Sequence, residues 1–296
     1  MDVLCSCDEP YLPHAATTLC SLLEHNGAAR IHLFHHSIPA EGLSKLASLV
    51  ERYGGTLASY RITPDDLEGI RVQQSYWSIA NYFRLLAPRV LPAEVKKVLY
   101  LDSDIIIRRS LKDLWKIDLG DSPFAAVEDA FWDPKLDYVQ IPEGAKYFNS
   151  GVMLINLDYW RQHDVCGQAI DFVKNNPDKV NYVDQDALNA IFVGRWINLP
   201  PIWNDQAKAQ IHVPAVRNLD VSNPAIVHFL GAHKPWMWSC NHPFRRDYRK
   251  YRVKTPWREF RLEGKPRLYL LRRVARMVLP SDVRQWIRSR VARAQA

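Results

Sequence analysis

The sequence predicts an α/β fold, with a mostly parallel sheet that is covered by helices on both faces. Short apolar runs, typical of buried strands, alternate along the chain with segments in which apolar residues recur at helical spacing. The chain has 296 residues, of which 47% are apolar and 24% are charged. It is therefore long enough for one large α/β domain or two small ones, and it has enough apolar side chains to bury a core.

The individual elements follow from these patterns. The expected strands lie, in chain order, at residues 3–7, 31–35, 57–61, 97–101, 124–127 and 152–155. The expected helices lie around residues 15–23, 40–52 and 78–87. Gly54 and Gly55 end the second helix, and Pro88 stops the third because proline has no N–H group to donate. We expect residues 97–101 to form a central strand.

Composition excludes several classes of protein. No run approaches the roughly 18 apolar residues that a membrane span needs. The sequence begins Met1-Asp2-Val3-Leu4, without the basic and apolar regions of a secretory signal. The five cysteines are an odd set without zinc-finger spacing. We therefore expect no disulfide framework and a reducing, cytoplasmic compartment.

Charge divides the chain into an acidic body, residues 1–244, and a basic extension, residues 245–296. The extension holds 17 Lys and Arg against 4 Asp and Glu, a net charge of +13, whereas the body carries −6. An uneven distribution of this kind predicts two roles. We expect the body to carry the chemistry and the extension to adhere to an anionic surface.

Two short helices are expected in the extension, one at residues 268–279 and one after Ser281. The second carries an apolar stripe that includes Trp286, opposite arginine side chains, and this pattern is typical of helices that lie in a membrane interface. We therefore expect peripheral attachment to the inner face of the membrane. A solvated helix packed on the body is the alternative, and the lack of a recognised motif argues against nucleic acid.

Ligands of parallel sheets bind beyond the carboxyl ends of the strands, so the residues that follow each strand are the candidates for a site. The chain contains neither G-x-G-x-x-G nor G-x-x-x-x-G-K-[ST], so the phosphates of a bound nucleotide must be neutralised in another way. Asp102-Ser103-Asp104 follows the expected strand at residues 97–101. Two carboxylates at this spacing can both reach a hard cation that bridges phosphate oxygens.

The surroundings of this motif favour a functional interpretation. Apolar residues flank it at 98–101 and 105–107, and burying two carboxylates among them is costly unless a cation or another partner is present. The alternative is a solvated turn, because Asp and Ser are common in turns.

A third candidate ligand is His228, within the apolar run at residues 226–229. Gly231 and Lys234 follow it, and they suit close approach and charge contact with phosphate. A histidine in such a run is often only a core residue with satisfied hydrogen bonds. Two carboxylates, one imidazole and open positions suit Mn²⁺, with Mg²⁺ as the alternative.

The residues alone leave two other classes of function open. A phosphatase of the haloacid dehalogenase type would use Asp102 as nucleophile and Asp104 as acid. Such enzymes usually carry Thr or Val where this chain has Ile106, and their motif follows the first strand. A non-catalytic membrane- or nucleic-acid-binding protein would explain the extension, but not Asp102, Asp104 and His228 together.

Four ordered motifs resemble those of the family 8 glycosyltransferases, retaining sugar transferases with a single Rossmann-like nucleotide-diphospho-sugar-binding domain of the GT-A type. The likeness covers roughly residues 1–240 and is strongest to bacterial lipopolysaccharide galactosyl- and glucosyltransferases. The motifs are Val98-Leu99-Tyr100-Leu101-Asp102-Ser103-Asp104, Tyr147-Phe148-Asn149-Ser150-Gly151-Val152-Met153-Leu154-Ile155-Asn156, Asp184-Gln185-Asp186-Ala187-Leu188-Asn189, and His228-Phe229-Leu230-Gly231 with Lys234-Pro235-Trp236.

The resemblance implies a donor, UDP-galactose or UDP-glucose, and a saccharide acceptor, expected to be a lipid-linked lipopolysaccharide or lipooligosaccharide core. It also implies a role for each matching position. The metal ligands are Asp102, Asp104 and His228. The residues expected to hold the donor are Asp8 and Tyr11 at the uracil, Gly231 and Lys234 at the diphosphate, and Arg84 and Asn149 around the sugar. Ser103 is also expected to contact the donor. The catalytic candidates beside the donor sugar are Gln185, Asp184 and Asp129.

Retention at the anomeric carbon requires either an enzyme nucleophile or attack on the face that the leaving group occupies. Gln185 matches the family position nearest to the anomeric carbon, and an amide is a poor nucleophile. We therefore expect same-face attack that forms an α-linkage, with the leaving phosphate oxygen taking the proton of the acceptor. A covalent intermediate on Asp184 or Asp186 is the alternative. The acidic segment 184–186 also suits a helix N-terminus.

Overall fold

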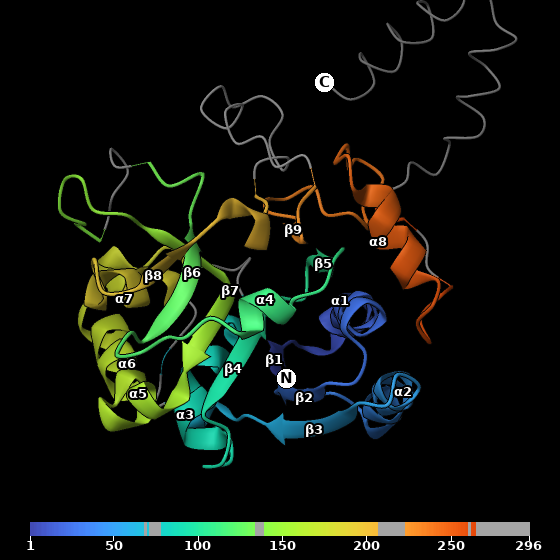
Figure 1. The fold of residues 1–296 in the computed structure, drawn as a ribbon, viewed down its shortest axis with the longest axis horizontal. Helices are drawn as coiled ribbons and strands as arrows, with labels where there is room; N and C mark the ends of the chain where they lie inside the picture. Colours follow the sequence, from blue (N-terminus) through green and yellow to red (C-terminus); the bar gives the residue numbers. More distant parts are fainter. Residues whose placement is uncertain (68–69, 71–77, 134–138, 207–222, 260–261, 265–296) are drawn as a thin grey trace, which may run out of the picture.

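The computed structural model describes residues 1–67, 70, 78–133, 139–206, 223–259 and 262–264, so both helices expected in the extension, at residues 268–279 and after Ser281, lie outside the described residues. A seven-stranded sheet forms the centre (Figure 1). From one edge to the other it contains β3 (Thr56–Arg61), β2 (Arg30–His35), β1 (Asp2–Ser6), β4 (Lys97–Leu101), β7 (Phe148–Asn156), β6 (Phe124–Glu128) and β8 (Ile197–Leu199).

The direction of one strand distinguishes this sheet from a fully parallel one. β7 is antiparallel to both β4 and β6, and the other six strands share one direction. The predicted mostly parallel sheet and the central place of residues 97–101 are confirmed. The reversal of β7 brings the start of this strand, Asn149 to Gly151, to the edge where β4 ends.

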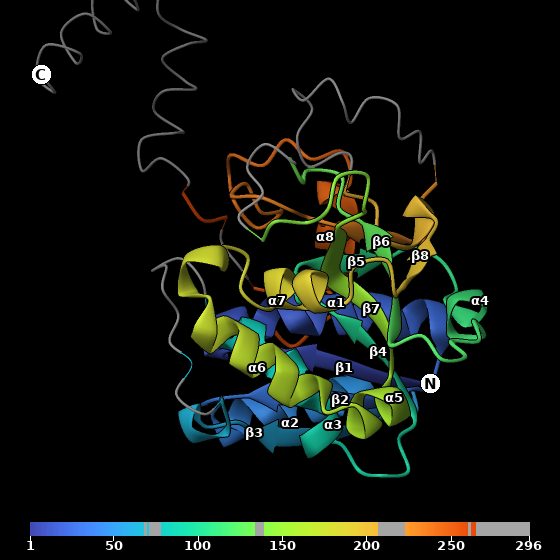
Figure 2. The ribbon, with the colours of Figure 1, turned by 90° about the vertical axis from the view of Figure 1, so that its left-hand side faces the viewer.

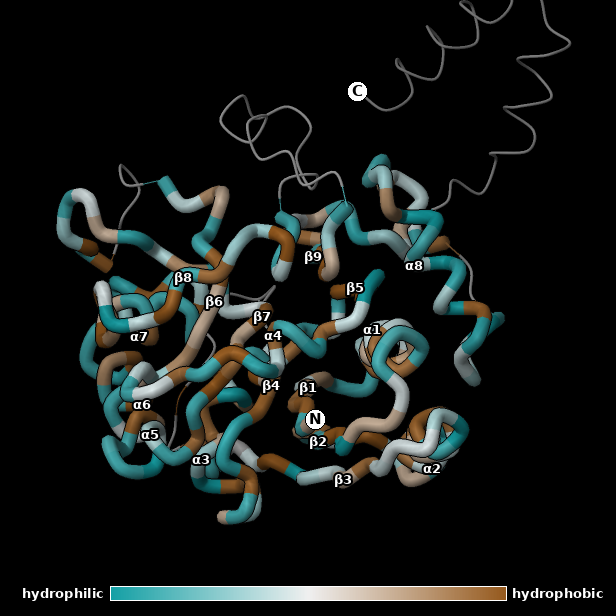
Figure 3. The backbone as a smooth tube through the Cα atoms, in the orientation of Figure 1, coloured by the Kyte–Doolittle hydropathy of each residue, from teal (hydrophilic) through white to brown (hydrophobic). Residues whose placement is uncertain are grey.

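Two layers of helices cover the sheet because alternate residues of its strands face opposite sides. Val3 and Cys5 of β1 pack into one core cluster, and Leu4 packs into the other. One layer contains α1 (Leu12–Asn26), α2 (Ala40–Glu51) and α8 (Arg245–Arg252). The second layer contains α3 (Ala87–Val90), α5 (Leu157–Gln162), α6 (Val165–Asn175) and α7 (Asp184–Ile191). Figure 1 shows the sheet between the two layers, and in Figure 2 the layer with α5, α6 and α7 faces the viewer. In Figure 3, hydrophobic segments concentrate in the interior strands.

The structure corrects the prediction for residues 78–87, which were expected to form a helix that stops at Pro88. It forms a 3₁₀ helix, η3 (Ile79–Leu86), whose first turn is capped by Ser78, and the chain then continues into α3. Pro88 lies in the first turn of α3 and does not end the helical segment. Proline is tolerated there because the first N–H groups of a helix have no partner within it.

A small second sheet connects two distant parts of the chain. β5 (Ile105–Ile107) pairs antiparallel with β9 (Ile226–His228), and Ile105 is opposite His228. The backbone N–H of Phe229 also donates to the carbonyl of Asp104, at 3.0 Å. This pairing places the predicted histidine ligand beside the predicted carboxylate pair.

The first helix of the basic extension, α8, packs against α1. Tyr248 is fully buried, and its hydroxyl lies 2.6 Å from Nδ1 of His14. The side chain of Lys254 forms an ion pair with Glu24, at 2.6 Å. Residues 245–254 are thus joined to the body by packing, hydrogen bonds and charge. None of the helices among the described residues has the length and apolar character required to cross a membrane.

Candidate active site

A cavity of about 850 Å³ opens at the edge of the sheet where β1, β4 and β6 end and β7 begins. The loops after these strands, η3, the start of α7 and the segment after β9 supply its walls. All thirteen residues predicted for the site line this cavity: Asp8, Tyr11, Arg84, Asp102, Ser103, Asp104, Asp129, Asn149, Asp184, Gln185, His228, Gly231 and Lys234. The fold therefore brings together residues that lie more than 200 positions apart in the sequence.

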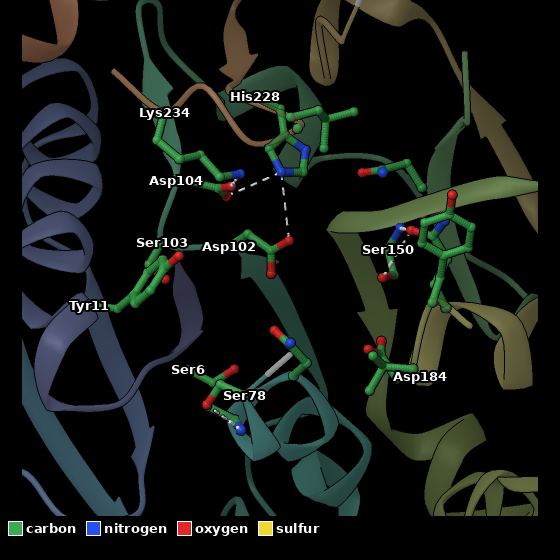
Figure 4. Close-up of a pocket in the computed structure, with 18 of the residues that line it drawn as sticks. Ser6, Tyr11, Ser78, Asp102, Ser103, Asp104, Ser150, Asp184, His228 and Lys234 are labelled. Atoms are coloured by element: carbon green, nitrogen blue, oxygen red, sulfur yellow. Dashed lines mark hydrogen bonds and ion pairs between the residues drawn. The ribbon is translucent and has the colours of Figure 1, made fainter. Parts of the chain in front are cut away.

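Asp102, Asp104 and His228 form what we call the cation end of the cavity. One candidate ligand atom from each lies within 4.8 Å of the other two. Nε2 of His228 is 3.2 Å from Oδ1 of Asp104 and 3.7 Å from Oδ2 of Asp102 (Figure 4). A Cβ on Gly151 would come within 2.2 Å of the His228 ring and 2.7 Å of Asp102 Oδ2, so glycine is needed there. This set of oxygen and imidazole ligands fits a divalent cation.

The second carboxylate oxygen of Asp102 is held by neighbouring side chains. Its Oδ1 accepts from the hydroxyl of Tyr100 at 2.7 Å and from the guanidinium of Arg84 at 2.9 Å. Arg84 also lies over the Tyr100 ring, 4.0 Å from its centroid. These contacts fix the carboxylate so that Oδ2 faces His228.

Lys234 supplies a positive charge at the same end of the cavity. Its ammonium group donates to Oδ2 of Asp104 and to the carbonyl of Phe229. Burial by itself raises the pKa of Asp104, but the charges of Lys234 and His228 outweigh burial and hold that pKa below its ordinary value. Asp104 is therefore a carboxylate across the physiological range. Gly231, with a φ of 78°, makes the turn between β9 and Lys234.

Asp8 and Tyr11 lie beside the cation end, at the carboxyl end of β1. The Asp8 side chain accepts from the backbone N–H of Tyr11, at 3.3 Å, and caps the short 3₁₀ helix η1 (Glu9–Tyr11). The edge of the Tyr11 ring meets Trp236, which stacks on His14 with centroids 3.6 Å apart. Tyr11 remains 39% exposed, so its ring is available for contact with a planar ligand.

Asp129, Asn149 and Gln185 form what we call the amide end. Oδ2 of Asp129 accepts from the side-chain amides of Asn149 and Gln185, each at 3.1 Å. Oε1 of Gln185 accepts from the backbone N–H of Ser150, at 2.9 Å. Val183, just before α7, has a φ of 57°, which is costly for a β-branched residue. The fold thus imposes the position at which Asp184 and Gln185 enter the cavity, and the predicted helix N-terminus is confirmed.

Arg84 connects the two ends of the cavity. Besides Asp102, its guanidinium contacts Asp184, with 3.0 Å between Nε and Oδ2. Burial is the main influence on Asp184 and raises its pKa to about 7, although Arg84 acts in the opposite direction. Asp184 consequently changes its charge near neutral pH.

Three further residues lie near the site without a role predicted from the sequence: Tyr100, Asn204 and Glu263. Tyr100 belongs to a quoted motif, but only the fold reveals its contact with Asp102. Glu263 lines the cavity although it belongs to the basic extension, because its backbone pairs with that of Trp236 and Trp238. Asn204 is buried against His228 and Asn149. No pattern in the sequence marks Asn204 or Glu263.

Residues 2–240 match the profile of glycosyl transferase family 8. The chain belongs to this family. This is the family that the four sequence motifs resemble. It is not the family of the alternative interpretation, the haloacid dehalogenase-like phosphatases.

Individual relatives agree with this membership. General stress protein A of Bacillus subtilis is 30% identical, over 87% of this chain and 94% of its own length. Lipopolysaccharide glucosyltransferase WaaO of Escherichia coli is 26% identical, over 87% of this chain and 79% of its own. The chain spans only 30–31% of the length of two streptococcal glycosyltransferases that it also matches.

The fold resembles that of a solved family member. The galactosyltransferase LgtC, whose structure contains donor and acceptor sugar analogues, superposes with a TM-score of 0.77 at 27% identity, over 86% of this chain and 96% of its own. The protein thus has the GT-A nucleotide-sugar transferase fold, as the sequence predicts, and it is a glycosyltransferase by family.

Proposed function

We propose that this protein transfers galactose or glucose from a UDP-sugar to a saccharide acceptor, with retention, and that the reaction requires a divalent cation, Mn²⁺ before Mg²⁺. The observation that carries the proposal is the cation end itself. Two carboxylates and an imidazole converge within 4.8 Å in a cavity that also holds Tyr11 and Lys234. A cation site, an exposed ring and a positive side chain together suit a nucleoside diphosphate in a chain without a glycine-rich phosphate loop.

In this proposal, Asp102, Asp104 and His228 hold the cation, which when bound stabilises negative charge on the leaving diphosphate. Lys234 adds a fixed positive charge to the same oxygens. Tyr11 offers its exposed ring to the uracil, and Asp8, Ser103 and Gly231 form the adjoining wall. These groups orient the nucleotide with its sugar toward the amide end.

At the amide end, Asn149, Asp129 and Gln185 position the donor sugar, with Arg84 and Asp184 beside them. Gln185 is already hydrogen-bonded through both atoms of its amide, which suits a positioning role. Both carboxylate oxygens of Asp186 accept hydrogen bonds, from the Tyr147 hydroxyl and from two backbone N–H groups. We therefore favour same-face attack, in which the leaving phosphate oxygen takes the acceptor's proton, over a covalent intermediate on Asp184 or Asp186.

The reaction is tested by a donor screen. Purified protein is incubated with UDP-galactose, UDP-glucose and their N-acetyl forms, and UDP release is measured with Mn²⁺, with Mg²⁺ and with chelator. We expect release from one of the two hexose donors, lost with chelator and restored by Mn²⁺. Undiminished release in excess chelator would contradict the proposed cation.

For the acceptor, we propose a lipid-linked lipopolysaccharide or lipooligosaccharide core. The names of relatives such as WaaO support a lipopolysaccharide acceptor, and the net charge of +13 on residues 245–296 supports attachment to an anionic membrane face. Such attachment holds the site near a two-dimensional pool of acceptor.

Flotation with anionic and neutral liposomes, at low and high salt, tests this attachment. We expect the full chain to float with the anionic liposomes, and a chain lacking residues 265–296 to remain soluble while still using small acceptors. Failure of the full chain to float with either liposome at low salt would contradict the membrane proposal.

A further inference from the structure

Asn204 lies between the two ends of the cavity and contacts both. It is 1% exposed and follows the short 3₁₀ helix η6 (Pro201–Trp203). Its Oδ1 is 3.2 Å from Nδ1 of His228, and its Nδ2 is 2.9 Å from Oδ1 of Asn149. Asn149 in turn donates to Asp129. A line of buried polar groups therefore runs from the histidine at the cation end to the carboxylate at the amide end.

The backbone fixes the direction of this line. The backbone N–H of Gly151 donates to one atom of the Asn149 side chain, at 3.1 Å, so that atom must be the oxygen. The other atom, the nitrogen, then faces the carboxylate of Asp129, which can only accept. Both neighbours of Asn149 thus require the same orientation of its amide.

The orientation of Asn149 determines that of Asn204. Because Asn149 presents an oxygen, Asn204 must present its NH₂ group to it; the flipped amide would set two acceptors 2.9 Å apart. Oδ1 of Asn204 then faces His228, and the histidine must donate from Nδ1. When Nε2 binds a cation, the imidazole has one N–H, which this hydrogen bond keeps on Nδ1, and the lone pair of Nε2 is free for the ion. Without a cation, Asp104 lies 3.2 Å from Nε2 and favours a second hydrogen on that nitrogen, because a carboxylate can only accept.

We propose that Asn204 is a positioning residue that holds His228 in the tautomer with hydrogen on Nδ1, through a chain of amides whose direction is set by the backbone N–H of Gly151. A lone pair on Nε2 is what a cation requires of this histidine, and a hydrogen there would block it. The use of this tautomer for metal binding rests on the proposed role of His228 as a ligand. The position of the hydrogen on Nδ1 follows from the hydrogen bonds alone and does not depend on that role.

The first test uses the wild-type protein without metal. Histidine is labelled with ¹⁵N, and the imidazole nitrogens are observed by long-range ¹H–¹⁵N correlation at about two pH units above the ordinary histidine pKa of 6.5. We expect His228 to carry a hydrogen on Nδ1. A bare Nδ1 with the hydrogen on Nε2 would overturn the inference.

The second test measures the affinity for Mn²⁺ alone, by calorimetry or electron paramagnetic resonance, in Asn204→Leu. We expect this affinity to fall about 10- to 100-fold, as for other partners of metal-binding histidines. Asn26→Leu is the matched control, because the Asn26 side chain also makes two hydrogen bonds, to the backbone of Leu22 and Leu111, outside the cavity. Unchanged Mn²⁺ affinity in Asn204→Leu would contradict the inference.

The two tests separate this inference from the proposed function. The nitrogen spectrum needs neither a variant nor a metal, so it decides the tautomer even if Asn204→Leu does not fold. A wild-type chain that shows Nδ1–H but binds no Mn²⁺ would support the inference and contradict the proposed cation.

Discussion

The two ends of the cavity differ in the kind of polar groups that they contain and in how these groups are paired. At the cation end, three ligand atoms that suit a divalent cation lie within 4.8 Å, and two of them belong to carboxylates. At the amide end, both oxygens of Asp129 and both polar atoms of the Asn149 and Gln185 amides have hydrogen-bond partners within the protein. The carboxylates of the cation end are paired with Arg84 and Lys234 and lie where they could also hold a cation, whereas the amide end is complete as folded.

This difference suggests how the work is divided. In the proposed function, binding of the donor at the cation end depends strongly on the ion that Asp102, Asp104 and His228 would hold. Hydrogen-bonded amides hold their geometry before any ligand is present, which lowers the cost of ordering a sugar. Removing a ligand at the cation end should therefore be far more damaging than removing an amide at the other end.

The largest effect is expected for the metal ligands. Asp102→Ala, Asp104→Ala and His228→Ala should each lower sugar transfer by at least about 10³-fold, because a bound cation contributes several kcal/mol to charge stabilisation in the transition state. UDP release at saturating Mn²⁺ measures this. Near wild-type rates in any of the three would remove that residue from the proposed ligand set.

A second prediction uses the buried Asp184, whose pKa is raised to about 7. The folded state favours its neutral form, so the stability that this group contributes is complete below pH 3.8 and is lost as the pH rises through 7. Relative to the wild type, Asp184→Asn should therefore gain stability between about pH 4 and pH 8, by on the order of 4 kcal/mol.

Denaturant unfolding of the metal-free proteins across this pH range checks the prediction. Asp158→Asn, at the surface, corrects for the loss of one negative charge. A stability difference between Asp184→Asn and the wild type that does not vary with pH would show that Asp184 is ionised throughout.

A smaller effect is expected at the amide end. Gln185→Ala should lower the transfer rate by about 10²-fold and leave the product's anomeric configuration unchanged, because the amide positions the sugar without bonding to it. Analysis of the product by NMR reports the configuration. A covalent sugar adduct trapped on wild-type Asp184 or Asp186, seen by mass spectrometry, would overturn this view.

The smallest effect is expected for Tyr100, whose hydroxyl helps to hold Asp102 at the cation end. Tyr100→Phe keeps the ring beneath Arg84 but removes the hydroxyl that donates to Asp102. We expect Mn²⁺ affinity to fall by about 10-fold, since Arg84 still holds the same oxygen. Tyr251→Phe, which loses a hydroxyl contact with His25 outside the cavity, is the control. Equal affinities in the two variants would contradict a positioning role for Tyr100.

The sequence by itself determined the elements and the chemistry at their ends. The run of apolar residues within 97–101 predicts a buried strand. Asp102 and Asp104 then lie at the carboxyl end of that strand, because they follow it directly in the chain. Periodicity and strand ends are local properties, so the α/β class and the candidate ligands Asp102, Asp104 and His228 could be predicted before the fold was known. Arg84, Asp129, Asn149 and Gln185 were expected only from the family resemblance.

The tertiary structure decided what depends on contacts between distant segments. An apolar run reads the same in either direction, so only the pairing with β4 and β6 reverses β7 and brings Asn149 and Gly151 to the site. The tautomer inferred for His228 depends on Asn204, 24 residues away, and on a backbone N–H on β7. A hydrogen-bond chain of this kind has no sequence period, because each of its members comes from a different element.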